Sequence, residues 1–326
     1  MFRSRAGGIL ACKGDSRAVT RPWKEERMVG EGPRSTSMSP LVEIVIIARR
    51  ELWRGTRSLK GVLVGVLTML GALLTSLVCV WIEGASRSSA LSADQFIDLK
   101  RQALERATGS ATLSEYLARS PTSLFFFLEA TVWLVPNLVV LLGFDAIASE
   151  LQSRSVRYWT VRVRRSSYFM GKLFGLWATV GVVALAMNAI AGIVVLGRGY
   201  VSVGDLLVWG FRFWAVAFAI AGAWCALAIL VSACFRSPML SLLSTAGVFW
   251  ALGIFGVVAA TARRSDALTR GVMREMSWHE YLYPNAYDIP LLSPERGKCL
   301  AALGILVVLI AAVAALGAAL FQRRDI

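Results

Sequence analysis

The sequence predicts an all-α membrane protein with six transmembrane helices, and three observations lead to this prediction. Of the 326 residues, 56% are apolar and only 17% are charged, and the mean hydropathy is +0.60. Six stretches each hold about 20 mostly apolar residues, enough for a helix to cross about 30 Å of hydrocarbon. One such stretch fits a soluble core, but six do not. The predicted spans are Gly61–Ile82, Leu124–Phe144, Leu173–Leu196, Leu206–Val231, Met239–Ala260 and Cys299–Leu320.

Two segments precede the first span. Residues 1–37 are polar and without periodicity, so we expect a disordered extension followed by a membrane domain over residues 38–326. The start of that domain has the periodicity of an amphipathic helix, with Arg50 and Arg54 on the polar face and Trp53 beside them. This pattern favours a helix lying in the cytoplasmic interface. The alternative is a plain N-terminal extension of the first span.

The two longer loops on the outer side, residues 83–123 and 261–298, are expected to form amphipathic helices at the outer interface. The first loop holds two pairs of residues with the spacing of a capping box, in which the side chains satisfy free amides at a helix start. These pairs are Ser92 with Gln95 and Thr112 with Glu115. The second loop mixes charges with aromatic residues.

The distribution of basic residues predicts the orientation. If the N-terminus is cytoplasmic, most of the 35 Lys and Arg residues fall in cytoplasmic segments, including Lys60 before the first span and Arg323 and Arg324 after the last. We therefore expect both termini to be cytoplasmic, in a plasma membrane of the bacterial inner-membrane type. The formal net charge of +14 follows mostly from this topology, so no nucleic-acid partner is expected.

No catalytic residue, metal site or cofactor site is expected in this chain. The sequence has no GxxxxGK followed by Ser or Thr to bind a nucleotide, no HExxH and no GxSxG. Its one histidine, His279, lies in the outer loop without other ligand-type residues around it. The cysteines lack CxxC spacing and are interpreted as small apolar residues. They are Cys12, Cys79, Cys225, Cys234 and Cys299.

Two ionisable residues fall inside predicted spans, where a charge is costly and is usually paired or functional. They are Glu129 in the second span and Arg212 in the fourth, both about 8 to 9 Å from the outer ends of their spans at 1.5 Å per residue. One hypothesis is that they form an ion pair near the outer side. The alternative is that each side chain reaches separately to the outer interface.

The loop between the second and third spans, Asp145 to Lys172, is too long for a tight turn and is expected to form a short helix below the membrane. Asp145 near its start and Arg154 and Arg157 further along suit the dipole of such a helix. A loop that only fixed topology would explain the arginines. It would not explain Asp145 and Glu150 at the cytoplasmic edge.

At this loop the sequence resembles the permease subunits of ATP-binding-cassette (ABC) transporters, specifically the type 2 exporter family. In that family the second span typically ends in Asp, followed by Ile-Ala-x-Glu, a Gly-Thr and, at the start of the third span, Gly-Lys. The matching residues here are Asp145, Ile147, Ala148, Glu150, Ser155 in the Thr position, Gly171 and Lys172. Arg154 stands where Gly is usual, and Val163 stands where Pro is common. The tail Phe321, Arg323, Arg324 and Asp325 also resembles the family's ending.

The resemblance implies a dimer of six-span subunits, each with an N-terminal elbow helix that here holds Arg50, Trp53 and Arg54. A separate ATPase subunit would bind ATP and magnesium and receive the loop from Asp145 to Lys172, which we call the coupling segment. The residues implied in coupling are Asp145, Glu150, Arg154, Arg157, Arg165 and Lys172. The partners would be that ATPase, a second permease subunit and the lipid bilayer.

Two other functions stay open at the level of sequence. A membrane-embedded lipid-modifying enzyme would need clustered His, Asp or Glu at one membrane edge, whereas only Glu129 and Arg212 lie within the spans. A membrane anchor or scaffold in an ATP-driven machine could share the same layout without transporting a substrate.

Overall fold

The computed structural model describes residues 39–88, 93–108, 110–160, 163–199, 201–270 and 282–324. Within these ranges the regular structure is helical and no strand is present, in line with the predicted fold class. Several predictions fall outside the described residues. These are the disorder of residues 1–37, Cys12, the cap at Ser92, His279 and Asp325.

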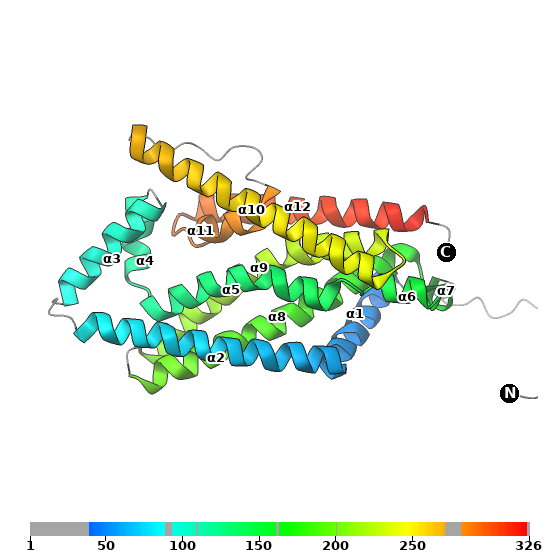
Figure 1. Ribbon diagram of the computed structural model, residues 1–326, viewed down its shortest axis with the longest axis horizontal. Helices are drawn as coiled ribbons and strands as arrows, with labels where there is room; N and C mark the ends of the chain where they lie inside the picture. Colours follow the sequence, from blue (N-terminus) through cyan, green and yellow to red (C-terminus); the bar gives the residue numbers. More distant parts are fainter. Residues whose placement is uncertain are drawn as a thin grey trace, which may run out of the picture. The chain divides into compact units, whose positions relative to one another are not determined.

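Six helices of the described chain are long and apolar enough to cross a membrane, which confirms the predicted number of spans. Each predicted span lies within one of these helices to within a residue. In Figure 1 the six run along a common direction, with the shorter helices gathered at their two ends. The helices are α2 (Leu59–Ser88), α5 (Thr122–Gly143), α8 (Arg165–Gly197), α9 (Val203–Cys234), α10 (Pro238–Arg270) and α12 (Arg296–Gln322).

Helix α9 is the centre of the membrane domain. In its most apolar window 67% of the residues are buried, against 22% in α2 and 17% in α10 and in α12. Its Phe213 and Trp224 side chains are almost fully buried, and α5, α8 and α12 pack around it. Because α9 is apolar on all sides, its sequence suits a helix surrounded by other helices, whereas α2, α10 and α12 leave broad apolar faces for lipid or another chain.

Helix α1 (Pro40–Arg57) is separate from the first span. Ser58 separates the two helices, since its backbone is extended with φ −69° and ψ 145°. Its hydroxyl accepts a hydrogen bond from the Gly61 amide at 3.0 Å. Helix α1 is therefore not a straight extension of α2, and Figure 1 shows it turning away from the axis of α2. One face packs on α8 through the buried Ile47, while Val45 and Trp53 are exposed.

At the opposite end of the domain, α3 (Ala93–Thr108) and α4 (Ala111–Ala118) pack together. Helix α4 begins after Ser110, whose hydroxyl accepts a hydrogen bond from the Leu113 amide at 3.4 Å, so the predicted cap at Thr112 is wrong by two residues. Ser110 was overlooked because no Glu or Gln follows it at the spacing of a capping box.

A short segment before the last span also enters the helix bundle, through η2 (Pro284–Tyr287) and α11 (Asp288–Leu291). Asn285 is 7% exposed; its side chain accepts a hydrogen bond from Trp224 Nε1 at 2.8 Å and donates one to the Val132 carbonyl at 3.2 Å. A buried amide with both ends bonded ties this segment to α9 and α5.

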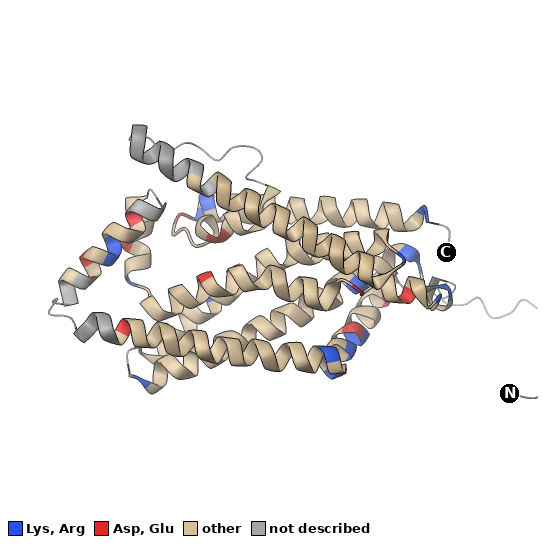
Figure 2. Ribbon diagram, in the orientation of Figure 1, with Lys and Arg blue, Asp and Glu red and all other residues tan. Residues whose placement is uncertain are grey.

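Between α5 and α8 the described chain forms two short helices, α6 (Ala148–Gln152) and α7 (Val156–Thr160), rather than the one predicted. Arg154 separates them with φ 56°, in the left-handed region that glycine favours. Figure 2 shows that charged residues gather at the two ends of the long helices and that the middle parts are mostly uncharged.

Candidate functional site

Glu150 of α6 is the centre of a buried cluster of charges. It is 5% exposed, and its Oε1 atom accepts hydrogen bonds from Lys172 Nζ at 2.6 Å and Arg54 Nη1 at 2.9 Å. Its Oε2 atom accepts a hydrogen bond from the Tyr168 hydroxyl. Lys172, whose side chain is 1% exposed, also pairs with Glu51 at 2.7 Å. We call these five residues, from α1, α6 and α8, the Glu150 cluster.

The cluster can form because α1 and α8 approach each other very closely. A Cβ atom on Gly171 would lie 2.6 Å from the Ile47 Cβ, and one on Gly175 would lie 2.5 Å from the Glu51 Cβ, so alanine does not fit at either position. The two glycines are four residues apart and share one face of α8, which is the small-xxx-small pattern of closely packed membrane helices. Glu51 is thereby brought within bonding distance of Lys172.

Two further contacts fix the start of the coupling segment. Asp145 pairs with Lys60 of α2 at 2.6 Å, and both side chains are about one-third exposed. The amides of Ile147 and Ala148 both donate to the Ser232 hydroxyl at 3.1 Å, near the end of α9. The Ile-Ala pair is fully buried, so this part of the coupling segment is anchored within the membrane domain rather than exposed to a partner.

Helix α7 presents the exposed part of the coupling segment. Tyr158 is 81% exposed, and Arg157 beside it is exposed. On the other side of the helix, Trp159 is half-buried beneath the Arg50 guanidinium, 4.1 Å from the ring centroid, which connects α7 to α1 through a cation–π contact. Helix α7 thus has one side held by α1 and one side open.

The structure accounts for both departures from the family pattern. Arg154 adopts a positive φ, which explains why Gly is usual at this position. Its Cβ atom strains the backbone there, while the rest of its side chain is exposed. The Val163 amide donates to the carbonyl of Trp159 in α7 at 2.9 Å. A proline at 163 has no amide hydrogen to make this bond.

The remaining predicted coupling residue, Arg165, reaches the end of the last span. Its Nη1 atom donates to the carbonyls of Gln322 and Arg324, both at 3.0 Å. These carbonyls end α12, where a cation satisfies free acceptors and suits the helix dipole. Tyr168 stacks on Phe321 with ring centroids 5.8 Å apart. Residues 321–324 therefore contact the start of α8, close to the Glu150 cluster.

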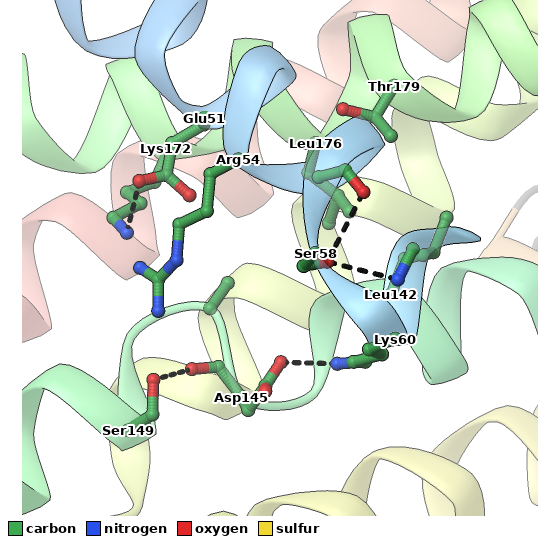
Figure 3. A pocket seen from close by; sticks show the side chains of 13 residues that line it. Glu51, Arg54, Ser58, Lys60, Leu142, Asp145, Ser149, Lys172, Leu176 and Thr179 are labelled. Atoms are coloured by element: carbon green, nitrogen blue, oxygen red, sulfur yellow. Dashed lines mark hydrogen bonds and ion pairs between the residues drawn. The ribbon is translucent and has the colours of Figure 1, made fainter. Parts of the chain in front are cut away.

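A polar pocket of about 210 Å³ lies beside the Glu150 cluster. Its walls come from the junction of α1 and α2, the end of α5 with the turn after it, and α8. Figure 3 shows the Arg54 guanidinium and the Lys60 ammonium group on opposite sides of the Asp145 loop. Leu142 and Leu176 form the apolar part of the lining.

Of the two hypotheses for the intramembrane charges, the ion pair between Glu129 and Arg212 is absent from the ion pairs of the described residues. The Arg212 guanidinium donates to the Tyr116 hydroxyl, to the Leu292 carbonyl at 2.8 Å and to the Ser293 carbonyl at 3.1 Å. Glu129 is half-buried in α5. Arg212 instead ties α9 to α4 and to the segment after α11, contacts that no sequence spacing could predict.

Sequence reasoning did not identify four residues that build the site: Glu51, Lys60, Tyr168 and Ser232. One signal was available, because two glycines four residues apart at the start of a span indicate a closely packed neighbour helix. No comparable signal exists for Ser232, which lies more than 80 residues from the amides it binds.

Within the described residues, no group of three or more His, Cys, Asp or Glu side chains could hold a metal ion. No curated protein sequence matches the chain significantly. The family description "ABC-2 family transporter protein" matches residues 45–326, which is most of the chain and includes the Glu150 cluster and all six spanning helices. The chain therefore belongs to the ABC-2 transporter family, whose membrane domain it forms.

Proposed function

We propose that this transmembrane subunit is driven by a separate ATPase, which binds ATP and magnesium and contacts the coupling segment. The observation that carries the proposal is the Glu150 cluster, which bonds the coupling segment to α1 and α8 at once. Helix α7 receives the force, and the cluster passes it to the elbow helix and to the third span.

The exposed face of α7 supports this division of roles. Tyr and Arg are the residue types most enriched among those that dominate protein–protein binding energy, and Tyr158 and Arg157 are exposed side by side. Glu150, in contrast, is buried and bonded to α1 and α8. Reversing its charge would place three cations together in the interior, so we expect Glu150 to act in force transmission and not in docking.

The remaining features of the proposal follow from the family and from the surface of the helices. The subunit works as an exporter in a dimer, with α2, α10 and α12 offering apolar faces to lipid and to the second subunit. It is placed in the bacterial inner membrane with both termini cytoplasmic, because basic residues surround the α1 side. ATP binding shifts the dimer between inward-open and outward-open states by rigid-body motion.

Site-specific photo-crosslinking in native membranes tests the proposal. A photoreactive amino acid replaces Tyr158 in one variant and Val203 in a control variant. Val203 is 61% exposed but starts α9 at the other end of the domain. We expect position 158 to capture a protein with a nucleotide-binding Walker motif and position 203 not to do so. Failure of position 158 to capture any ATPase, in a functional variant, would overturn the proposal.

A further inference from the structure

The pocket beside the Glu150 cluster has charged and apolar side chains in its lining. Lys60 opens the first span, and Asp145 follows the end of α5, so both residues lie where two spanning helices meet the cytoplasmic interface. The pocket is open to this interface, because the side chains of Lys60 and Asp145 are each about one-third exposed.

The two cations that flank the opening have donors to spare. Arg54, with a side chain 52% exposed, gives Nη1 to Glu150, and Lys60 gives one hydrogen bond to Asp145. A guanidinium carries five donors and an ammonium group three. Each of the two cations therefore keeps donors for a charge-assisted hydrogen bond to a phosphate group without breaking the Glu150 cluster.

The pocket also offers a negative group, which distinguishes it from a simple anion site. Asp145 uses Oδ1 for Lys60 and has a second carboxylate oxygen, and Glu51 lines the opposite wall. A purely anionic ligand would bring its charge next to these carboxylates. A ligand with both a phosphate and an ammonium group would offer one group to each sign, since the three cations of the lining are paired with Asp145, Glu51 and the adjacent Glu150.

The size of the pocket sets the class of ligand. Its volume is about 210 Å³. Pockets for drug-sized ligands are larger, about 300–1,000 Å³. A headgroup of a few heavy atoms fits, while a bulky transport substrate does not.

We propose that this pocket binds a phosphoethanolamine group, with the phosphodiester on Arg54 and Lys60 and the primary ammonium group on Asp145. The group comes either from phosphatidylethanolamine in the membrane or from soluble glycerophosphoethanolamine. Because the pocket joins the elbow junction to the start of the coupling segment, an occupied pocket holds these two elements together. The binding itself requires no ATPase, so its test is independent of the proposed function.

Lipid retention by the purified full chain tests the proposal. The chain is reconstituted in nanodiscs of phosphatidylethanolamine, phosphatidylcholine or phosphatidylglycerol, and native mass spectrometry counts the lipids it keeps. We expect phosphatidylethanolamine to be retained at least about fivefold over the other two, because choline has no N–H donor for Asp145 and the glycerol headgroup has no cation. Equal retention of the three lipids would overturn the proposal.

Variants locate the binding in this pocket. Lys60→Gln should lower phosphatidylethanolamine retention about tenfold, as expected for one lost charge-assisted bond, and Lys60→Arg should keep it. The matched control is Lys298→Gln, since Lys298 also pairs with a carboxylate, Glu295 at 3.0 Å, but starts α12 away from the pocket. Asp145→Asn should remove the preference for phosphatidylethanolamine over phosphatidylglycerol. Wild-type retention in Lys60→Gln, or an unchanged preference in Asp145→Asn, would overturn the proposal.

Two further measurements keep the result interpretable. Near-UV circular dichroism checks that each variant is folded. If Lys60→Gln does not fold, the two single variants Asp145→Asn and Lys60→Arg carry the test. Titration of the chain in lipid-free detergent with glycerophosphoethanolamine separates the two sources of the group. Saturable binding identifies the soluble compound as a ligand, whereas binding of the lipid alone identifies the membrane source. Binding in neither arm would overturn the proposal.

Discussion

Neutralising Glu150 tests the buried cluster without changing its shape. Glu150→Gln keeps one carbonyl oxygen as an acceptor but removes the charge that Lys172 and Arg54 share at Oε1. Breaking a buried ion pair typically costs about 3–5 kcal/mol, because an uncompensated charge remains in the interior. Here Lys172 keeps Glu51 at 2.7 Å, and the Arg54 side chain is 52% exposed and can turn to solvent. We therefore expect a loss near the lower limit, about 3 kcal/mol.

Glu115→Gln provides the matched control. The ion pair of Glu115 with Arg119 has the same 2.9 Å distance as that of Glu150 with Arg54, but its side chains are 62% and 75% exposed. An exposed pair four residues apart in a helix is worth about 0.3–0.5 kcal/mol. The two substitutions are chemically identical and differ mainly in burial.

Thermal unfolding in detergent micelles at pH 7, followed by tryptophan fluorescence, measures both variants. We expect Glu150→Gln to lower the midpoint by several degrees and Glu115→Gln to leave it almost unchanged. In a double-mutant cycle with Lys172→Met, the combined loss should differ from the sum of the single losses by at least about 0.5 kcal/mol. Equal midpoints for the two Gln variants would refute the reasoning that Glu150 is the centre of a buried network.

Four further predictions concern backbone, packing and charge. Arg154→Gly should raise the stability by up to about 1 kcal/mol, because it relieves the strain of φ 56°; a clear loss in the unfolding midpoint would contradict this. Gly175→Ala should lower the free energy of unfolding by about 1–3 kcal/mol, because its Cβ would push α1 away from α8. Gly247→Ala, whose Cβ would have no neighbouring atom within 4 Å, should cause no loss. Equal unfolding midpoints for the two variants would exclude the close packing. Arg212→Met should lower the free energy of unfolding by about 2 kcal/mol, because it leaves two carbonyls and a hydroxyl without their donor. A loss below roughly 0.5 kcal/mol, measured in the same way, would argue against these bonds. Burial lowers the pKa of Lys100 from 10.5 to about 8, so the unfolded chain binds this proton more tightly than the folded chain does. The stability of the α3–α4 pair should therefore rise between about pH 8 and 10.5. Hydrogen exchange in this pair should show the rise, and Lys100→Met should remove it.

The sequence was sufficient to predict the spans, because the length of an apolar stretch directly reflects the thickness of the hydrocarbon. The periodicity before Lys60 predicted α1, and its polar and apolar faces are explained by one side packing on α8 and another remaining exposed. These are local features, each determined by residues close together in the chain.

The arrangement of the site could not be predicted, because it depends on contacts between distant residues. Glu150 was expected in a cytoplasmic loop, but its environment is set by Arg54, 96 residues earlier, and by Lys172 on the next span. Arg212 had a plausible partner in Glu129 by depth alone. Depth fixes the level of a residue in the membrane but not its neighbours on other helices, and Arg212 bonds Tyr116, Leu292 and Ser293 instead.

The most direct test of the central claim measures the affinity of the purified chain for its partner ATPase, once crosslinking has identified it. Tyr158→Ala should weaken binding about thirtyfold, as for the loss of a dominant aromatic contact worth about 2 kcal/mol. Trp81→Ala should leave it unchanged, since Trp81 is similarly exposed, at 74%, but lies near the other end of α2. Equal affinities of the wild type and both variants would contradict the claim that α7 is where the ATPase acts.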